Sequence, residues 1–121
     1  FPFIDVVLCK KMTDCEYDFI TKEWLKLYAQ RKNFILIFNS TQVESMSLKY
    51  LYRIVEFSKK LKKLPEKDQF LKCSIVIINN RLVNSLVTLY TKLIKPISKI
   101  YIISSVDEID DIRKEILSNG I

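Results

Sequence analysis

The chain has 121 residues, of which 49% are hydrophobic and 28% are charged, so it is long enough for one domain, residues 1–121, with its own core. It contains no histidine and only one glycine, which excludes histidine-based triads, histidine metal sites and glycine-rich phosphate-binding loops. Its net charge of +6 is compatible with an acidic partner, although charged helix faces explain most of that charge equally well.

The sequence also indicates where the protein works. Its apolar runs are all shorter than a membrane-spanning helix, and FPFIDVVLCKK at its start does not resemble a signal peptide. The three cysteines form no CxxC motif, which predicts free thiols in a reducing compartment. We therefore expect a cytoplasmic protein with no transmembrane segment, no metal and no cofactor.

The first half of the chain predicts two strands and two helices. Residues 3–9 form an apolar run, and a helix follows from Thr13, where TDCE is a capping box with Glu16. Residues 33–38 are apolar on both faces, which is typical of a central strand in a parallel sheet. A second helix is expected over residues 45–63, with Leu48 and Leu51 in its buried stripe, and Pro65 ends it.

The second half repeats this order. Residues 73–78 and 99–103 are apolar runs that predict strands, and residues 81–95 form an amphipathic helix that Pro96 ends. A last helix opens with a capping box from Ser105 to Glu108 and stops before Gly120. The order β-α-β-α-β-α-β-α predicts an α/β fold with a four-stranded, mainly parallel sheet and four helices, which cover both faces or mainly one.

Polar residues follow the strands at their carboxyl ends, where ligands of open parallel sheets bind. Hydroxyl groups, amides and one arginine beside helix N-termini favour an anion such as phosphate or a carboxylate. The same residue types are also common N-caps and turn formers. The candidate binding residues are Asn39, Ser40, Thr41, Asn79, Asn80, Arg81, Ser104 and Ser105.

The segment ESMSL, residues 44–48, carries a family resemblance. It follows a strand and a polar turn and precedes an amphipathic helix, and it is similar to the D-S-S-G-L turn of the anti-sigma-factor antagonist (STAS) domain, the SpoIIAA-like fold. The resemblance implies a regulatory, protein-binding module and adds Ser45 and Ser47 as candidate binding or phosphorylation sites at a helix N-terminus. Lipid-binding domains of the CRAL-TRIO type share this architecture, so function stays open.

Three hypotheses for function follow. The first is a non-enzymatic, STAS-like interaction module with a protein partner. The second is an anion-binding module for a lipid headgroup or nucleic acid, acting through a basic helix face. An enzyme that uses a cysteine nucleophile is the third, and Cys9, next to Lys10 and Lys11, is its best candidate over Cys15 and Cys73. The basic residues of the second hypothesis are Lys59, Lys60, Lys62, Lys63, Lys67 and Lys72.

Overall fold

The structure is a computed structural model that describes residues 3–95 and 98–118. Four parallel strands form one sheet in the order β1-β2-β3-β4, and helices alternate with them along the chain, which confirms the predicted α/β fold. The first strand, whose direction the sequence left open, pairs parallel with the second. The strands are β1 (Phe3–Val7), β2 (Phe34–Asn39), β3 (Leu71–Ile77) and β4 (Lys99–Ile103). The helices are α1 (Asp14–Ala29), α2 (Leu48–Lys62), α3 (Arg81–Leu93) and α4 (Ile109–Ser118), with short 3-10 turns η1 (Glu66–Asp68) and η2 (Val106–Glu108).

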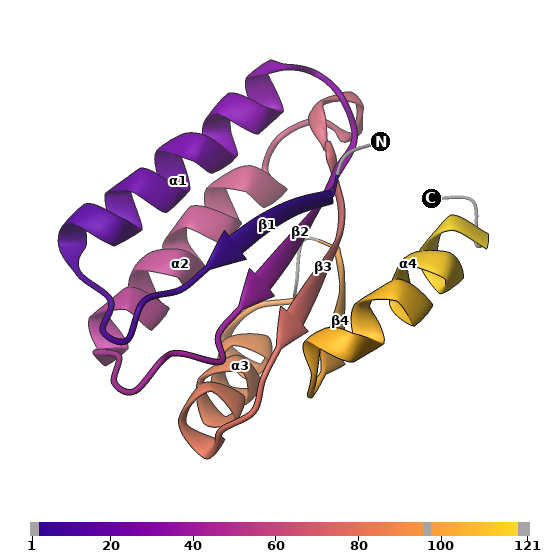
Figure 1. Ribbon diagram of the computed structural model, residues 1–121. Helices are drawn as coiled ribbons and strands as arrows, with labels where there is room; N and C mark the ends of the chain where they lie inside the picture. The colour runs from indigo at the N-terminus through magenta and orange to yellow at the C-terminus, as the bar shows by residue number, and fades with distance from the viewer. Residues whose placement is uncertain (1–2, 96–97, 119–121) are drawn as a thin grey trace.

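The helices are divided unequally between the two faces of the sheet. Helices α1, α2 and α3 lie on one face, and α4 lies on the other (Figure 1). Each of the first three helices connects neighbouring strands in the same direction across the sheet, and right-handed crossovers of this kind place all of them on one face. Since no described strand follows α4, this handedness does not constrain it.

The core has two main clusters, one on each face of the sheet. The side chains of β2 alternate between them: Phe34 packs with Trp24 of α1 on the three-helix face, while Ile35 packs with Ile116 of α4 on the other. Ile35 and Ile116 are both fully buried. A strand that is buried on both faces must be apolar at consecutive positions, so the continuous apolar run of residues 34–38 marks the middle of the sheet.

Helix α2 begins three residues later than the sequence predicted, and its N-cap is Ser47. In the preceding turn, Val43 packs in a cluster with Ile78 and Val83, and Met46 packs against the same cluster and that of Tyr17. These contacts hold both residues outside the helix. The prediction that Leu48 is buried was wrong, because its side chain is 50% exposed in the first turn. Helix α3 ends at Leu93, two residues before the predicted end.

The two predicted capping boxes have different outcomes. Thr13 caps α1 by accepting a hydrogen bond from the Glu16 amide at 3.1 Å. The Glu16 carboxylate does not complete that box, because it accepts a hydrogen bond from the Cys9 amide instead, at 3.1 Å. The box of Ser105 and Glu108 is complete, but it caps the short turn η2 in front of α4.

Candidate functional site

The polar residues that follow β2 stabilise the turn. Ser40 is fully buried, and its hydroxyl donates a hydrogen bond to the Ile77 carbonyl of β3. The Asn39 side chain accepts hydrogen bonds from the amide and the hydroxyl of Thr41, at 3.1 and 2.7 Å. These three predicted binding residues therefore have internal partners that account for their polarity.

Ser45 and Ser47 lie further along the same segment and are exposed. The amide of Ser45 donates to the Lys10 carbonyl at 3.1 Å, while the Ser47 hydroxyl accepts from the Lys49 amide at 3.3 Å as the N-cap of α2. Phosphorylation of either serine stays a prediction.

The predicted residues after β3 and β4 come together. Asn79, Asn80, Arg81 and Ser104 line one open hollow of ≈530 Å³ at the carboxyl end of the sheet. Glu108 also lines this hollow, and its carboxylate accepts hydrogen bonds from the amide and hydroxyl of Ser104, at 2.9 and 3.0 Å.

Glu108 therefore already accepts the hydrogen bonds of donor groups that a bound anion would need. Ser105 is the last of the predicted binding residues, and its amide also donates a hydrogen bond to Glu108, at 3.0 Å. Hydrogen bonds from the Ser104 amide and hydroxyl hold the pKa of Glu108 below its ordinary value, so it carries a negative charge at neutral pH. A carboxylate in this position opposes the binding of a second anion.

The basic residues of the anion-binding hypothesis lie in the last turn and at the C-cap of α2, in η1 and at the start of β3. The ammonium of Lys62 donates to the Lys95 carbonyl at 2.9 Å, and that of Lys72 donates to the Gln69 carbonyl at 3.2 Å. Lys59 forms an exposed ion pair with Glu56 at 3.4 Å. Binding of an anionic partner here stays a prediction.

The cysteine environments oppose the expected thiolate. The hydrogen bond and the negative charge of Glu16 raise the pKa of Cys9, the opposite of the effect expected from Lys10 and Lys11. Burial raises the pKa of Cys73, which points into the sheet core. A raised pKa keeps a thiol protonated, and protonated thiols are poor nucleophiles.

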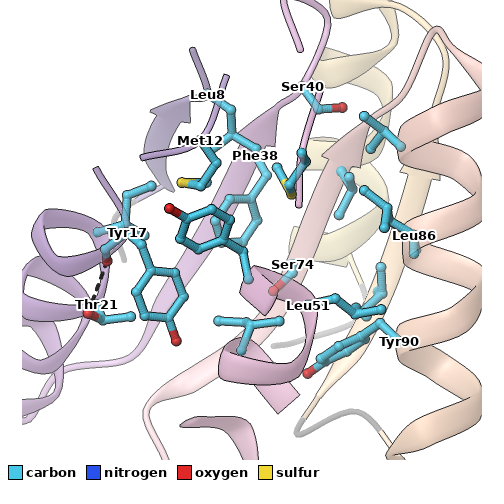
Figure 2. A pocket seen from close by; sticks show the side chains of 18 of the residues that line it. Leu8, Met12, Tyr17, Thr21, Phe38, Ser40, Leu51, Ser74, Leu86 and Tyr90 are labelled. Atoms are coloured by element: carbon cyan, nitrogen blue, oxygen red, sulfur yellow. Dashed lines mark hydrogen bonds between the residues drawn. The ribbon is translucent and has the colours of Figure 1, made fainter. Parts of the chain in front are cut away.

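The structure contains an apolar cavity that the sequence did not predict. Its volume is ≈220 Å³, and it lies between the sheet and the three helices of one face (Figure 2). For comparison, an apolar cavity of about 150 Å³ is large enough to bind benzene. Aromatic and aliphatic side chains from α1, α2 and α3 form its walls, among them Tyr17, Trp24, Ile54, Leu86 and Tyr90.

Two hydrogen bonds connect α3 with α2 and with the segment before α2. The hydroxyls of Ser58 in α2 and Tyr90 in α3 form a hydrogen bond of 2.7 Å toward the C-terminal ends of the two helices. Toward the N-terminal end of α3, the Asn80 side chain donates to the Val43 carbonyl in the segment that precedes α2, at 3.3 Å. These two hydrogen bonds link α3 to α2 and to the segment that precedes it, beside the cavity.

The chemistry of the lining is neutral. The residues that surround the cavity include no lysine, arginine, aspartate, glutamate or cysteine, as far as the described chain shows. Ser74 lies on the sheet side of the cavity (Figure 2), and its hydroxyl has no hydrogen-bond partner among the described residues. The indole N–H of Trp24, which also lines the cavity, is buried without a hydrogen-bond partner in the described chain. The site can therefore hold an uncharged, mainly apolar molecule and offer it polar groups from Ser74 and Trp24.

One signal in the sequence pointed to this cavity. Ser74 interrupts the apolar run of residues 73–78 at a position where a buried strand is expected to be apolar. A polar residue in such a strand needs a partner, and Ser74 has none among the described residues. The remaining lining residues are apolar or aromatic, and their pattern is the same whether they fill a core or surround a space.

Neither the models of known protein families, nor curated proteins, nor solved structures give a significant match to this chain. The resemblance to the STAS domain therefore stays a prediction. Within residues 3–95 and 98–118, no helix is long and apolar enough to cross a membrane. The same residues contain no group of three or more cysteine, aspartate or glutamate side chains that could hold a metal ion.

Proposed function

We propose that the protein is a non-enzymatic binding module that holds a small, uncharged, mainly apolar molecule between its sheet and helices α1, α2 and α3. The observation that carries this proposal is the cavity of ≈220 Å³ with its apolar lining. Apolar pockets with a few polar groups are the usual form of small-molecule sites. The Ser74 hydroxyl and the buried, unpartnered indole N–H of Trp24 favour a ligand with one hydrogen-bonding group, such as a long-chain alcohol.

The charge of the ligand follows from the lining. Transfer of an ionised group into apolar surroundings without a counter-charge is strongly unfavourable, and no charged side chain lines the cavity. A neutral ligand is therefore favoured over a fatty acid anion or a phosphorylated metabolite. The titratable groups that line the cavity are tyrosines, and burial raises the pKa of Tyr17, Tyr50 and Tyr90, so these groups stay neutral at neutral pH and suit binding of a neutral ligand.

Fluorescence titration with the neutral apolar probe N-phenyl-1-naphthylamine tests the proposal, followed by displacement with decanol. Val87→Phe places a larger side chain in the cavity wall on α3, and we expect it to weaken probe binding by about tenfold or more. Leu82→Phe is the matched control, because Leu82 lies on the same helix and does not line the cavity. Leu82→Phe should bind the probe as the wild type does.

The contribution of the Ser74 hydroxyl to binding can be tested separately. Ser74→Ala should weaken decanol binding by a few-fold and leave the binding of a hydrocarbon such as decane unchanged, because only the alcohol can form a hydrogen bond with the Ser74 hydroxyl.

Equal probe affinities of the wild type and a folded Val87→Phe protein would show that the probe binds elsewhere, and the proposal would be wrong. The protein-partner and anionic-partner hypotheses concern other surfaces and stay predictions.

A further inference from the structure

Strand β1 lies at an edge of the sheet. Among the described residues it pairs only with β2. The amide of Leu8, just after β1, donates to the Asn39 carbonyl at 3.0 Å, so the backbone groups of Leu8 point toward β2. Because successive residues of a strand point their N–H and C=O groups to opposite sides, those of Phe3, Asp5 and Val7 point outward, away from the sheet.

A groove runs beside this open edge. It has a volume of ≈450 Å³ and lies between β1 and helix α1, which are neighbours in Figure 1. Ile4 and Val6 of β1 contribute apolar side chains to the groove, and Phe19 and Ile20 contribute from α1. The side chain of Phe19 is 65% exposed, so an added segment would remove a large aromatic surface from water.

The groove is acidic, although the whole protein is basic. Glu16 and Glu23 of α1 line it, and no lysine or arginine does. Asp5 also borders the groove, but its side chain points to the opposite face of the sheet from Ile4 and Val6, because successive side chains of a strand alternate. Glu16 lies at the end of the edge, where it accepts the hydrogen bond of the outward-pointing Cys9 amide. Glu23 lies two helical turns further along α1 and forms an exposed ion pair with Lys26 at 3.0 Å. Carboxylates in this arrangement favour a partner with lysine or arginine side chains.

We propose that this groove binds an extended basic segment of another protein, which adds to the sheet as a fifth strand beside β1. The outward N–H and C=O groups of Phe3, Asp5 and Val7 would form the main-chain hydrogen bonds, as in other cases of strand addition. Alternate side chains of the segment would cover Phe19, and its cationic side chains would lie near Glu16 and Glu23.

A second copy of the chain fits this edge less well. A symmetric antiparallel pair of β1 strands centred on Asp5 would place the two Asp5 carboxylates opposite each other. Like charges in directly opposite positions destabilise a strand pair. Each copy would also bring its own acidic groove to the pair, so charge favours a basic partner over a second copy.

The test uses the whole chain and a fluorescent synthetic peptide of alternating valine and lysine residues, with a valine–glutamate peptide as the control. Fluorescence anisotropy should show that the lysine peptide binds about tenfold or more tightly than the glutamate peptide, and that added salt weakens it. In amide NMR spectra, the largest shifts on binding should lie at Phe3, Asp5 and Val7. Shifts confined to other surfaces would overturn the proposal.

Asp5→Pro blocks the edge without removing a hydrogen bond between β1 and β2, because the lost N–H points outward. We expect it to weaken peptide binding by about tenfold or more. Ile102→Pro is the matched control on β4, the opposite edge strand. Its N–H also points outward, because the neighbouring Ile103 carbonyl accepts the Ile78 amide of β3 at 2.9 Å.

Glu23→Lys keeps the proposal testable if the proline variant fails to fold. It should reduce the preference for the lysine peptide by about several-fold, because it replaces one of the carboxylates that line the groove with a cation while Glu16 remains. A folded Asp5→Pro protein with unchanged peptide affinity would contradict strand addition. If sedimentation shows a wild-type dimer that Asp5→Pro abolishes, a second copy occupies the edge, and the proposal of a separate partner is wrong. Binding of the apolar probe should be unaffected by either variant.

Discussion

The hydroxyl oxygens of Ser58 and Tyr90 lie 2.7 Å apart and join helices α2 and α3 across the three-helix face. Ser58 is fully buried, so its hydroxyl has no access to water as an alternative partner. A buried hydroxyl that loses its partner costs free energy. This contact therefore fixes the distance between the two helices that form part of the cavity wall.

Removal of the Tyr90 hydroxyl should destabilise the fold. Tyr90→Phe leaves the ring in place but deprives buried Ser58 of its partner, and we expect a loss of about 1–2 kcal/mol in the free energy of unfolding, measured by urea denaturation. Tyr52→Phe is the control on an exposed ring and should change stability little. The double variant Ser58→Ala, Tyr90→Phe should recover part of the loss. A single variant as stable as the wild type would show that the hydrogen bond contributes nothing net.

Stability should fall at alkaline pH. Burial is the main cause that raises the pKa of Tyr28 and of Tyr90 above the ordinary value of 10.0. The unfolded chain therefore releases these protons at a lower pH than the folded protein does. The contribution of these two tyrosines to the free energy of unfolding is fully present below about pH 10, and it is lost as the pH rises through their folded-state pKa values. Urea denaturation across this range should give a shallower decline for Tyr90→Phe, and a rise in stability above pH 10 would contradict the assignment.

Helix α4 should depend on one side chain for its attachment. Ile116 is fully buried against Ile35 and Ile37 of β2 and against β3. Ile116→Ala should cost about 2–5 kcal/mol, because it removes buried methyl groups and leaves a cavity. The adjacent Leu117 is 56% exposed, and Leu117→Ala should change the free energy of unfolding by less than about 0.5 kcal/mol. Similar losses for the two variants would mean that α4 packs differently.

Cys9 should become more reactive when Glu16 loses its charge. The carboxylate of Glu16 is the main cause that raises the pKa of the Cys9 thiol, so Glu16→Gln should lower that pKa and increase the thiolate fraction near neutral pH. The rate of iodoacetamide labelling, measured in a Cys15→Ser background, should increase about several-fold in Glu16→Gln. An unchanged rate would indicate that Glu16 does not control the thiol.

Much of the fold was predictable because it depends on local chemistry. Pro65 follows the end of α2, Thr13 caps α1, and the apolar run of residues 34–38 gives a strand buried on both faces. The start of α2 was predicted three residues too early. Its true position depends on Val43 and Met46, which pack against segments distant in sequence.

The candidate polar site was only partly predictable. Asn79, Asn80, Arg81 and Ser104, which the alternation of elements places at the carboxyl ends of β3 and β4, line one hollow, and their binding of an anion stays a prediction. The predicted capping box implied the hydrogen bond from the Ser105 amide to the Glu108 carboxylate. The two hydrogen bonds from Ser104 to the same carboxylate depend on how the turn η2 folds back on the end of β4, so capping alone did not predict them. Asn39, Ser40 and Thr41 instead form internal hydrogen bonds.

By itself, the sequence determined the class of fold, because hydrophobic periodicity and capping act within each segment. Among the residues that the structure describes, only the tertiary structure decided that α4 lies on the face opposite the other three helices, that α2 and α3 enclose a cavity with α1, and that the outer side of β1 is unpaired beside an acidic groove. These features depend on distances between segments that are far apart in the chain. An apolar side chain has the same place in the pattern whether it fills a core, lines a cavity or borders a groove, so periodicity alone cannot distinguish them.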